Sequence, residues 1–136
     1  MANELILIVE DNPKNLKLVR DTLQVTGYQT VEAKTGEDGV RLARERRPAL
    51  ILMDIQLPGM SGVEALGRLR AESVTRAIPV IAVTASVMPQ DRQRIMAAGF
   101  DGFQGKPISV KELLETIRQV LATSRPAADP EVRAGD

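Results

Sequence analysis

Short apolar runs alternate with segments of helical periodicity along the chain. The first run, LILIV at residues 5–9, contains no polar residue, which is typical of a strand buried on both faces of a parallel sheet. Further runs predict strands at residues 29–33, 50–54 and 79–84, and a weaker strand at residues 100–105.

Helix-start signals predict five helices between and after these runs. Residues that favour N-caps precede four of the starts, and glycine follows the end of the first helix. The predicted helices begin at Asn12-Pro13, Thr35, Ser61, Pro89 and Ser109, and the first two end near Thr26 and Arg46.

Five strands that alternate with five helices predict an α/β fold, a doubly wound parallel sheet with right-handed crossovers. The flavodoxin-like strand order 2-1-3-4-5 is the favoured arrangement for five such units. The folded domain is expected to cover residues 1–123. Residues 124–136 are rich in Pro, Ala, Asp and Glu without apolar periodicity, so a disordered tail is expected there.

Composition narrows the function by exclusion. The chain of 136 residues suits one domain, and its 18 basic and 18 acidic residues give no broad attraction to nucleic acid or membrane. It lacks cysteine, which excludes disulfides and thiolate metal sites, and it lacks histidine, which excludes histidine-based catalysis and a phosphohistidine donor. No signal pattern or bilayer-length apolar run is present, so we expect a cytoplasmic protein.

Charged residues stand where the predicted apolar strands end. Glu10-Asp11 follows the first strand, Asp54 ends the third, and Lys106 follows the fifth. Strands one and three are neighbours in the predicted sheet, so these acids meet at the crevice where such folds bind ligands. Clustered carboxylates suit Mg²⁺ and lysine suits phosphate, while a carboxylate can itself accept a phosphoryl group. The pattern predicts a metal-assisted phosphoryl site.

Two further residues lie at the end of the fourth strand, beside the predicted crevice. The Thr84 hydroxyl could bond a phosphoryl oxygen, and the small Ala85 leaves its backbone N–H accessible to one. Each of these features also has a purely structural interpretation. Glu10-Asp11 alone suits a solvated turn, Thr84 suits strand propensity and Lys106 suits the surface.

The landmarks Glu10-Asp11, Asp54, Thr84-Ala85 and Lys106-Pro107 occur in the order and spacing of a known family. The chain resembles the receiver domains of two-component response regulators over roughly residues 4–122. The stretches LILIVEDN, LILMDIQLPGMSG and KPISVKELLETI are especially similar to stand-alone receivers of the DivK type.

The resemblance implies a phosphoacceptor rather than an enzyme, and leaves self-catalysed phosphotransfer and autodephosphorylation open. Asp54 would take a phosphoryl group from the phosphohistidine of a histidine kinase or a histidine phosphotransferase. Asp11 would bind Mg²⁺ directly and Glu10 through water, with Asp54 and the Gln56 backbone carbonyl as further ligands. Lys106 would pair with the phosphate.

The resemblance also implies a switch. Thr84 would move to bond the phosphate and Phe103 would swing inward, while Gln56 and Ser86 would tune the phosphate lifetime. The Lys106-Pro107 bond would be cis. The output would be a changed face, formed by the fourth helix, fifth strand and fifth helix, that binds a downstream protein target and neither nucleic acid nor membrane.

Other functions on the same fold fit the sequence less well. An FMN site would need a phosphate cradle after the first strand, where Glu10-Asp11 would repel phosphate. An aspartate-nucleophile phosphatase would need its nucleophile there, with a second acid two residues later, and the stretch Glu10-Asp11-Asn12-Pro13 does not provide that pair. A degenerate receiver, acting as an interaction module without phosphorylation, is the main alternative.

Overall fold

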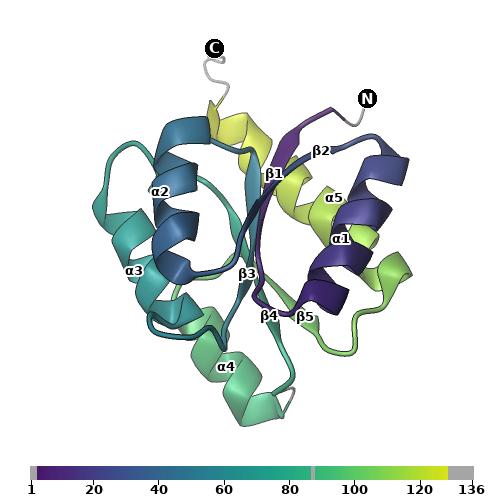
Figure 1. Cartoon of the computed structure of the whole chain (residues 1–136). Helices are drawn as coiled ribbons and strands as arrows, with labels where there is room; N and C mark the ends of the chain where they lie inside the picture. The colour runs from purple at the N-terminus through teal and green to yellow at the C-terminus, as the bar shows by residue number, and fades with distance from the viewer. Residues whose placement is uncertain (1–2, 87, 129–136) are drawn as a thin grey trace.

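The computed structural model describes residues 3–86 and 88–128, with side chains up to residue 123. It contains a five-stranded parallel sheet in the order β2-β1-β3-β4-β5, which confirms the predicted topology (Figure 1). The strands are β1 (Leu5–Val9), β2 (Gln29–Ala33), β3 (Leu50–Asp54), β4 (Val80–Thr84) and β5 (Gly102–Gly105). The helices are α1 (Pro13–Thr26), α2 (Gly36–Arg46), α3 (Gly62–Ala71), α4 (Pro89–Ala97) and α5 (Val110–Ala128).

The sheet lies between two helical layers. Helices α1 and α5 cover one face, and α2, α3 and α4 cover the other (Figure 1). Side chains of β1 alternate between the layers, so Ile6 and Ile8 pack with α1 and α5 while Leu7 and Val9 pack with the opposite helices. This alternation explains why the central strands are apolar throughout, since both of their faces are buried.

Local signals fix the helix ends much as predicted. The Asn12 side chain accepts hydrogen bonds from the backbone N–H groups of Lys14 and Asn15, which caps α1. Gly27 ends the helix in the left-handed conformation, at a φ of 108°, where glycine carries no Cβ penalty. Helix α1 therefore begins at Pro13, directly after its N-cap Asn12. The hydrogen bonds of this cap fix the turn between β1 and α1, which contains Asp11.

The last helix is longer than the sequence predicts. The sequence predicts a folded domain that ends at residue 123, whereas α5 continues to Ala128. Five residues of the expected tail, 124–128, therefore have a helical backbone, because the helix propagates beyond its last apolar anchor. The prediction of disorder for the rest of the tail concerns residues 129–136, which lie outside the described residues.

The register of the sheet aligns the strand ends at one edge. Val9 pairs with Met53, and Asp54 pairs with Val83 on the next strand. Thr84 in turn pairs with Gly105. The residues that end or follow β1, β3, β4 and β5 therefore share the carboxyl edge.

None of the helices in residues 3–86 and 88–128 combines the length and hydrophobicity needed to cross a bilayer.

Candidate functional site

Buried polar side chains are concentrated at the carboxyl edge of the sheet. Glu10, Asp54 and Thr84 are only 4%, 3% and 1% exposed. A buried charge is unfavourable unless it is paired and hydrogen-bonded, so each carboxylate here requires a partner. These three residues are ones that the sequence singled out.

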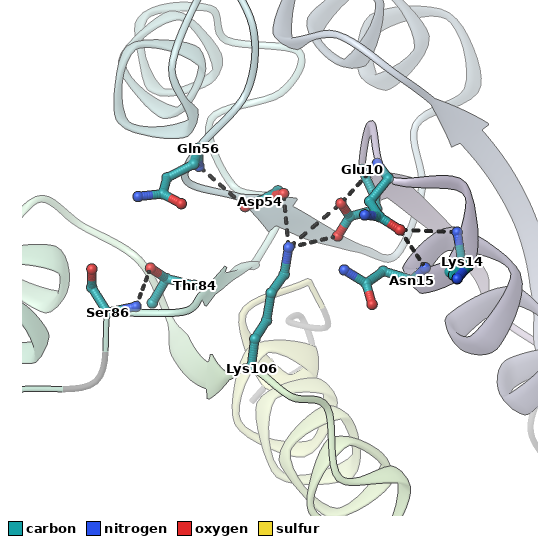
Figure 2. Close-up of polar contacts among 9 residues, drawn as sticks. Glu10, Lys14, Asn15, Asp54, Gln56, Thr84, Ser86 and Lys106 are labelled. Atoms are coloured by element: carbon teal, nitrogen blue, oxygen red, sulfur yellow. Dashed lines mark hydrogen bonds and ion pairs between the residues drawn. The ribbon is translucent and has the colours of Figure 1, made fainter.

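Lys106 supplies one partner for both buried carboxylates. Its side chain extends from the end of β5 to the space between Asp54 and Glu10 (Figure 2). The Nζ atom lies 3.0 Å from Asp54 Oδ2 and 3.2 Å from Glu10 Oε1. Burial lowers the pKa of Lys106, but the hydrogen bond and charge of Asp54, with the charge of Glu10, raise it above its usual value. The lysine is therefore held as a cation.

Glu10 is held from the other side by the backbone. The N–H of Asn12 donates a hydrogen bond of 3.1 Å to Glu10 Oε2. Burial is the main cause that raises the pKa of Glu10; the bond from Asn12 opposes it, and the neighbouring Asp54 adds to it. The folded protein therefore holds this carboxylate in an environment that disfavours its charge unless a cation is near.

A third carboxylate completes the cluster. Glu10, Asp11 and Asp54 each place one carboxylate oxygen within 4.8 Å of the others, and Asp11 is exposed to solvent. Lys106 offers a single positive charge against these three acids. Closely spaced carboxylate oxygens with an open side match the ligands that Mg²⁺ takes, since this ion keeps several waters. The donor set therefore fits a magnesium ion.

Asp54 is fixed in orientation by its own loop. The backbone N–H of Gln56 donates a hydrogen bond of 3.1 Å to Asp54 Oδ1, while Lys106 binds the other oxygen. Gly62 packs tightly against this loop, because a Cβ atom there would lie 2.3 Å from the Asp54 carbonyl oxygen. The start of α3 thus holds the turn that follows Asp54.

The remaining predicted residues lie on the other side of Asp54 from Glu10. Figure 2 shows Gln56, Thr84 and Ser86 there. The Thr84 hydroxyl accepts a hydrogen bond of 3.1 Å from the Ser86 backbone N–H, so it is bonded within its own loop. Ala85 is exposed between them. The structure therefore brings Thr84 to the crevice.

Phe103 has a neighbour that the sequence did not indicate. Its half-buried ring lies beneath the Arg92 guanidinium of α4, at 5.1 Å from the ring centroid. This distance is within the range of a cation–π interaction. No motif marks Arg92, since arginines are common on exposed helix faces.

The Lys106-Pro107 peptide bond is cis, as predicted.

Comparison with known proteins identifies the family. The protein-family model described as the response regulator receiver domain matches residues 6–118 of this chain. The chain belongs to the response regulator receiver family. Receiver domains are signalling proteins that take phosphoryl groups from histidine kinases in two-component systems.

Curated relatives and solved structures agree with this assignment. The polar-differentiation response regulator DivK of Brucella anthropi is 48% identical over 116 residues, which cover 85% of this chain and 94% of DivK. DivK of Brucella ovis is 47% identical over the same shares of the two chains. The receiver domain of the sensor histidine kinase PA1611 of Pseudomonas aeruginosa, solved with magnesium coordinated in its active-site cleft, superposes with a TM-score of 0.82 at 34% identity, covering 89% of this chain and 99% of that one. Chemotaxis protein CheY4 of Vibrio cholerae superposes with a TM-score of 0.81 at 29% identity, covering 88% and 99%. This receiver is therefore DivK-like in sequence and CheY-like in fold.

Proposed function

We propose that this receiver accepts a phosphoryl group on Asp54 from the phosphohistidine of a partner protein and signals through a change in its partner-binding surface. One observation carries the proposal: the nearly buried Asp54 carboxylate contacts Lys106 and lies within a cluster of three acids that a single lysine leaves with surplus negative charge. A structural ion pair would need only one acid. The surplus suits a site that is completed by a cation.

Glu10, Asp11, Asp54 and the Gln56 backbone carbonyl would hold Mg²⁺, which would neutralise charge on the transferring oxygens. Lys106 then faces a phosphoryl oxygen in place of the free carboxylate, and it is already cationic. The hydrogen bonds from the Gln56 N–H and Lys106 hold Asp54 in a fixed orientation before transfer.

The Thr84 hydroxyl and the Ala85 N–H supply donors to the new phosphoryl group. Thr84 reaches it by giving up its bond with the Ser86 N–H. Gln56 and Ser86 flank the acceptor and control the access of water, and so the lifetime of the acyl phosphate. Phosphorylation adds close to two negative charges. This added charge is enough to shift the loop after β4 between a form with the Thr84–Ser86 bond and a form with Thr84 on the phosphoryl group.

The output surface is the face of α4, β5 and α5. A groove of about 430 Å³ lies there. Movement of Phe103 would change the groove floor, because its ring lines the groove together with Arg92 on one side and Glu112 and Glu115 on the other. The downstream target is a protein that distinguishes the two forms of this groove. We place the protein in the cytoplasm, where histidine kinases present their phosphohistidine.

Phosphorylation with acetyl phosphate and Mg²⁺, followed by intact-mass measurement, tests the proposal. Wild-type protein is expected to gain one phosphoryl group, and Asp54→Asn is expected to gain none. Asp21→Asn on α1 serves as the matched control and should behave as wild type, because the half-exposed Asp21 carboxylate pairs with Lys17 of its own helix and lies outside the acidic cluster. No gain in the wild type would favour the degenerate receiver, while a gain that survives Asp54→Asn would place the acceptor elsewhere.

Lys106→Ala separates acceptance from response. This variant keeps the three carboxylates and is expected to bind Mg²⁺, but it loses the group that links the phosphate to β5. For wild type, the amount of target protein captured should therefore differ between beryllofluoride-treated and untreated protein. For Lys106→Ala, the two amounts should be the same. A full response in the variant would refute the role of Lys106.

A further inference from the structure

The groove between α4 and α5 has a wall of hydrogen-bond acceptors. Strand β5 is the last strand of the sheet, so this groove lies at an edge where no further described strand pairs. Its volume is about 430 Å³, and its lining comes from α4, β5 and α5: Arg92, Phe103, Gln104, Gly105, Glu112, Glu115, Thr116 and Gln119. The groove is therefore large enough for a side chain of a partner protein, and its chemistry is mainly polar.

Gln104 is buried in this wall with half of its amide group unpaired. The residue is 3% exposed, and its Nε2 atom donates a hydrogen bond of 3.2 Å to the Gly105 carbonyl oxygen. Its Oε1 atom accepts no hydrogen bond from any residue that the structure describes. A buried amide oxygen without a donor is rare, because it has lost its bonds to water. The wall thus holds an acceptor that a donor from outside the chain can satisfy.

The α5 side of the groove adds negative charge. Glu112 and Glu115 lie three residues apart on this helix, so their side chains share a face. Both are exposed, and neither forms an ion pair with a described residue. Arg92, the one cation among the described lining residues, lies instead over the Phe103 ring at 5.1 Å. Two anions and one cation leave the groove with surplus negative charge.

We propose that this groove binds an arginine side chain of the downstream target protein. The inference rests on the proposed function, which makes the face of α4, β5 and α5 the output surface. A guanidinium carries five N–H donors in a planar fork and is more weakly hydrated than an ammonium group. It can pair with a carboxylate of α5 and donate to a neutral acceptor such as Gln104 at the same time. An anionic side chain would meet the two acids instead.

Phe103 connects this site to phosphorylation. Its ring lines the groove and lies beneath Arg92, so an inward movement of the ring would remove the surface on which Arg92 rests. The position of the one described lining cation would then change, and with it the electrostatic potential that a target arginine meets. The affinity of the groove for arginine is therefore expected to differ between the phosphorylated and resting forms.

Three blocked tripeptides test the proposal: Ala-Arg-Ala, Ala-Lys-Ala and the same peptide with citrulline, which has the shape of arginine without its charge. The chain has two phenylalanines, so protein labelled with fluorophenylalanine gives two fluorine NMR signals. Phe103 lines the groove, and the buried Phe100 does not, so its signal is the internal reference. The arginine peptide should shift the Phe103 signal, with a dissociation constant about tenfold below that of the citrulline peptide. The lysine peptide should bind more weakly than the arginine peptide.

Substitutions locate the binding in the groove. Glu115→Gln should raise the dissociation constant of the arginine peptide about fivefold, and Gln104→Leu about threefold. Glu37→Gln is the matched control, because Glu37 is an exposed acid of α2 that does not line the groove. This control should leave the constant unchanged. Beryllofluoride with Mg²⁺ should change the constant of wild type about twofold or more.

Equal binding of the arginine and citrulline peptides, or of the arginine and lysine peptides, would overturn the proposal. An unchanged constant in either groove variant, or an equal rise in Glu37→Gln, would overturn it too. If wild type meanwhile gains a phosphoryl group on Asp54, the proposed acceptor stands and this inference alone fails. Arginine binding that beryllofluoride leaves unchanged would refute the output role of the groove, and the assignment to a downstream target with it.

Discussion

The two edges of the sheet hold charge in opposite ways. At the amino edge, the guanidinium of Arg70 in α3 donates to four acceptors. It lies 2.8 Å from Asp101 Oδ2, and Asp101 also accepts the backbone N–H of Val80 at 2.8 Å. The same guanidinium donates to the backbone carbonyl groups of Arg76, Ile78 and Gly99. One cation, one anion and the backbone ends of α3, β4 and β5 form a balanced unit.

At the carboxyl edge, one amine faces three carboxylates. Lys106 contacts Asp54 and Glu10, while Asp11 adds a further negative charge nearby. The comparison teaches that an ionic cluster with balanced charge stabilises the packing of the elements it joins. A cluster with surplus negative charge can in addition bind a cation. The surplus lies where the fold can best expose it to a ligand, at the switch point of the doubly wound sheet.

The largest effect is expected from breaking the balanced edge. Arg70→Ala would leave three carbonyl groups without this donor and Asp101 with the Val80 N–H alone. Because the ion pair with Asp101 is part-exposed, the free energy of unfolding should fall by about 2–3 kcal/mol, mainly through the lost hydrogen bonds. Arg68→Ala, on an exposed position of the same helix, is the control and should change it by less than about 0.5 kcal/mol. Urea denaturation measures both. Equal effects of the two substitutions would show that Arg70 is only a surface residue.

Two glycines of α3 give a second contrast. Gly62→Ala should destabilise the fold by about 2 kcal/mol, because the new Cβ would meet backbone atoms of Asp54 and Ile55. Gly67→Ala should stabilise it by about 0.5–1 kcal/mol, since no atom lies within 4 Å of its Cβ position and alanine favours the helix. Thermal denaturation should shift in opposite directions. A shared direction would mean that the Asp54 loop does not rest on α3 as described.

The smallest effect sharpens the carboxyl edge itself. Glu10→Gln should raise the free energy of unfolding by about 1 kcal/mol at neutral pH without Mg²⁺, because burial and Asp54 already disfavour the charge of Glu10. The sign follows from the raised pKa: the folded state prefers the uncharged side chain, so stability is lost as pH rises and Glu10 ionises. A fall in stability on this substitution would show that Glu10 is paired for stability alone.

Much of the fold could be predicted because its signals are local. Unbroken apolar runs such as residues 5–9 mark strands buried on both faces, and Asn12 and Gly27 mark the ends of α1. The acidic site followed from topology, since placing the first and third strands side by side brings Glu10 next to Asp54.

What the sequence did not reveal depends on contacts between distant segments. Arg70 and Asp101 are 31 residues apart, and no local pattern pairs them. The position of Arg92 over Phe103 depends on how α4 packs against β5. The extension of α5 past residue 123 has a different, local cause: the apolar periodicity ends before the hydrogen-bonded backbone does.

The central claim is that the carboxyl edge carries surplus negative charge that a bound cation neutralises. The most direct test measures the free energy of unfolding of wild type and of Asp54→Asn, each without Mg²⁺ and with saturating Mg²⁺. Without the ion, Asp54→Asn should be at least as stable as wild type, because one of three crowded acids is removed. With Mg²⁺ at a hundred times its dissociation constant, wild type should gain about 2.7 kcal/mol and the variant clearly less. If Asp54→Asn is less stable than wild type by the same amount in both conditions, Asp54 is a structural partner of Lys106, and the account is contradicted.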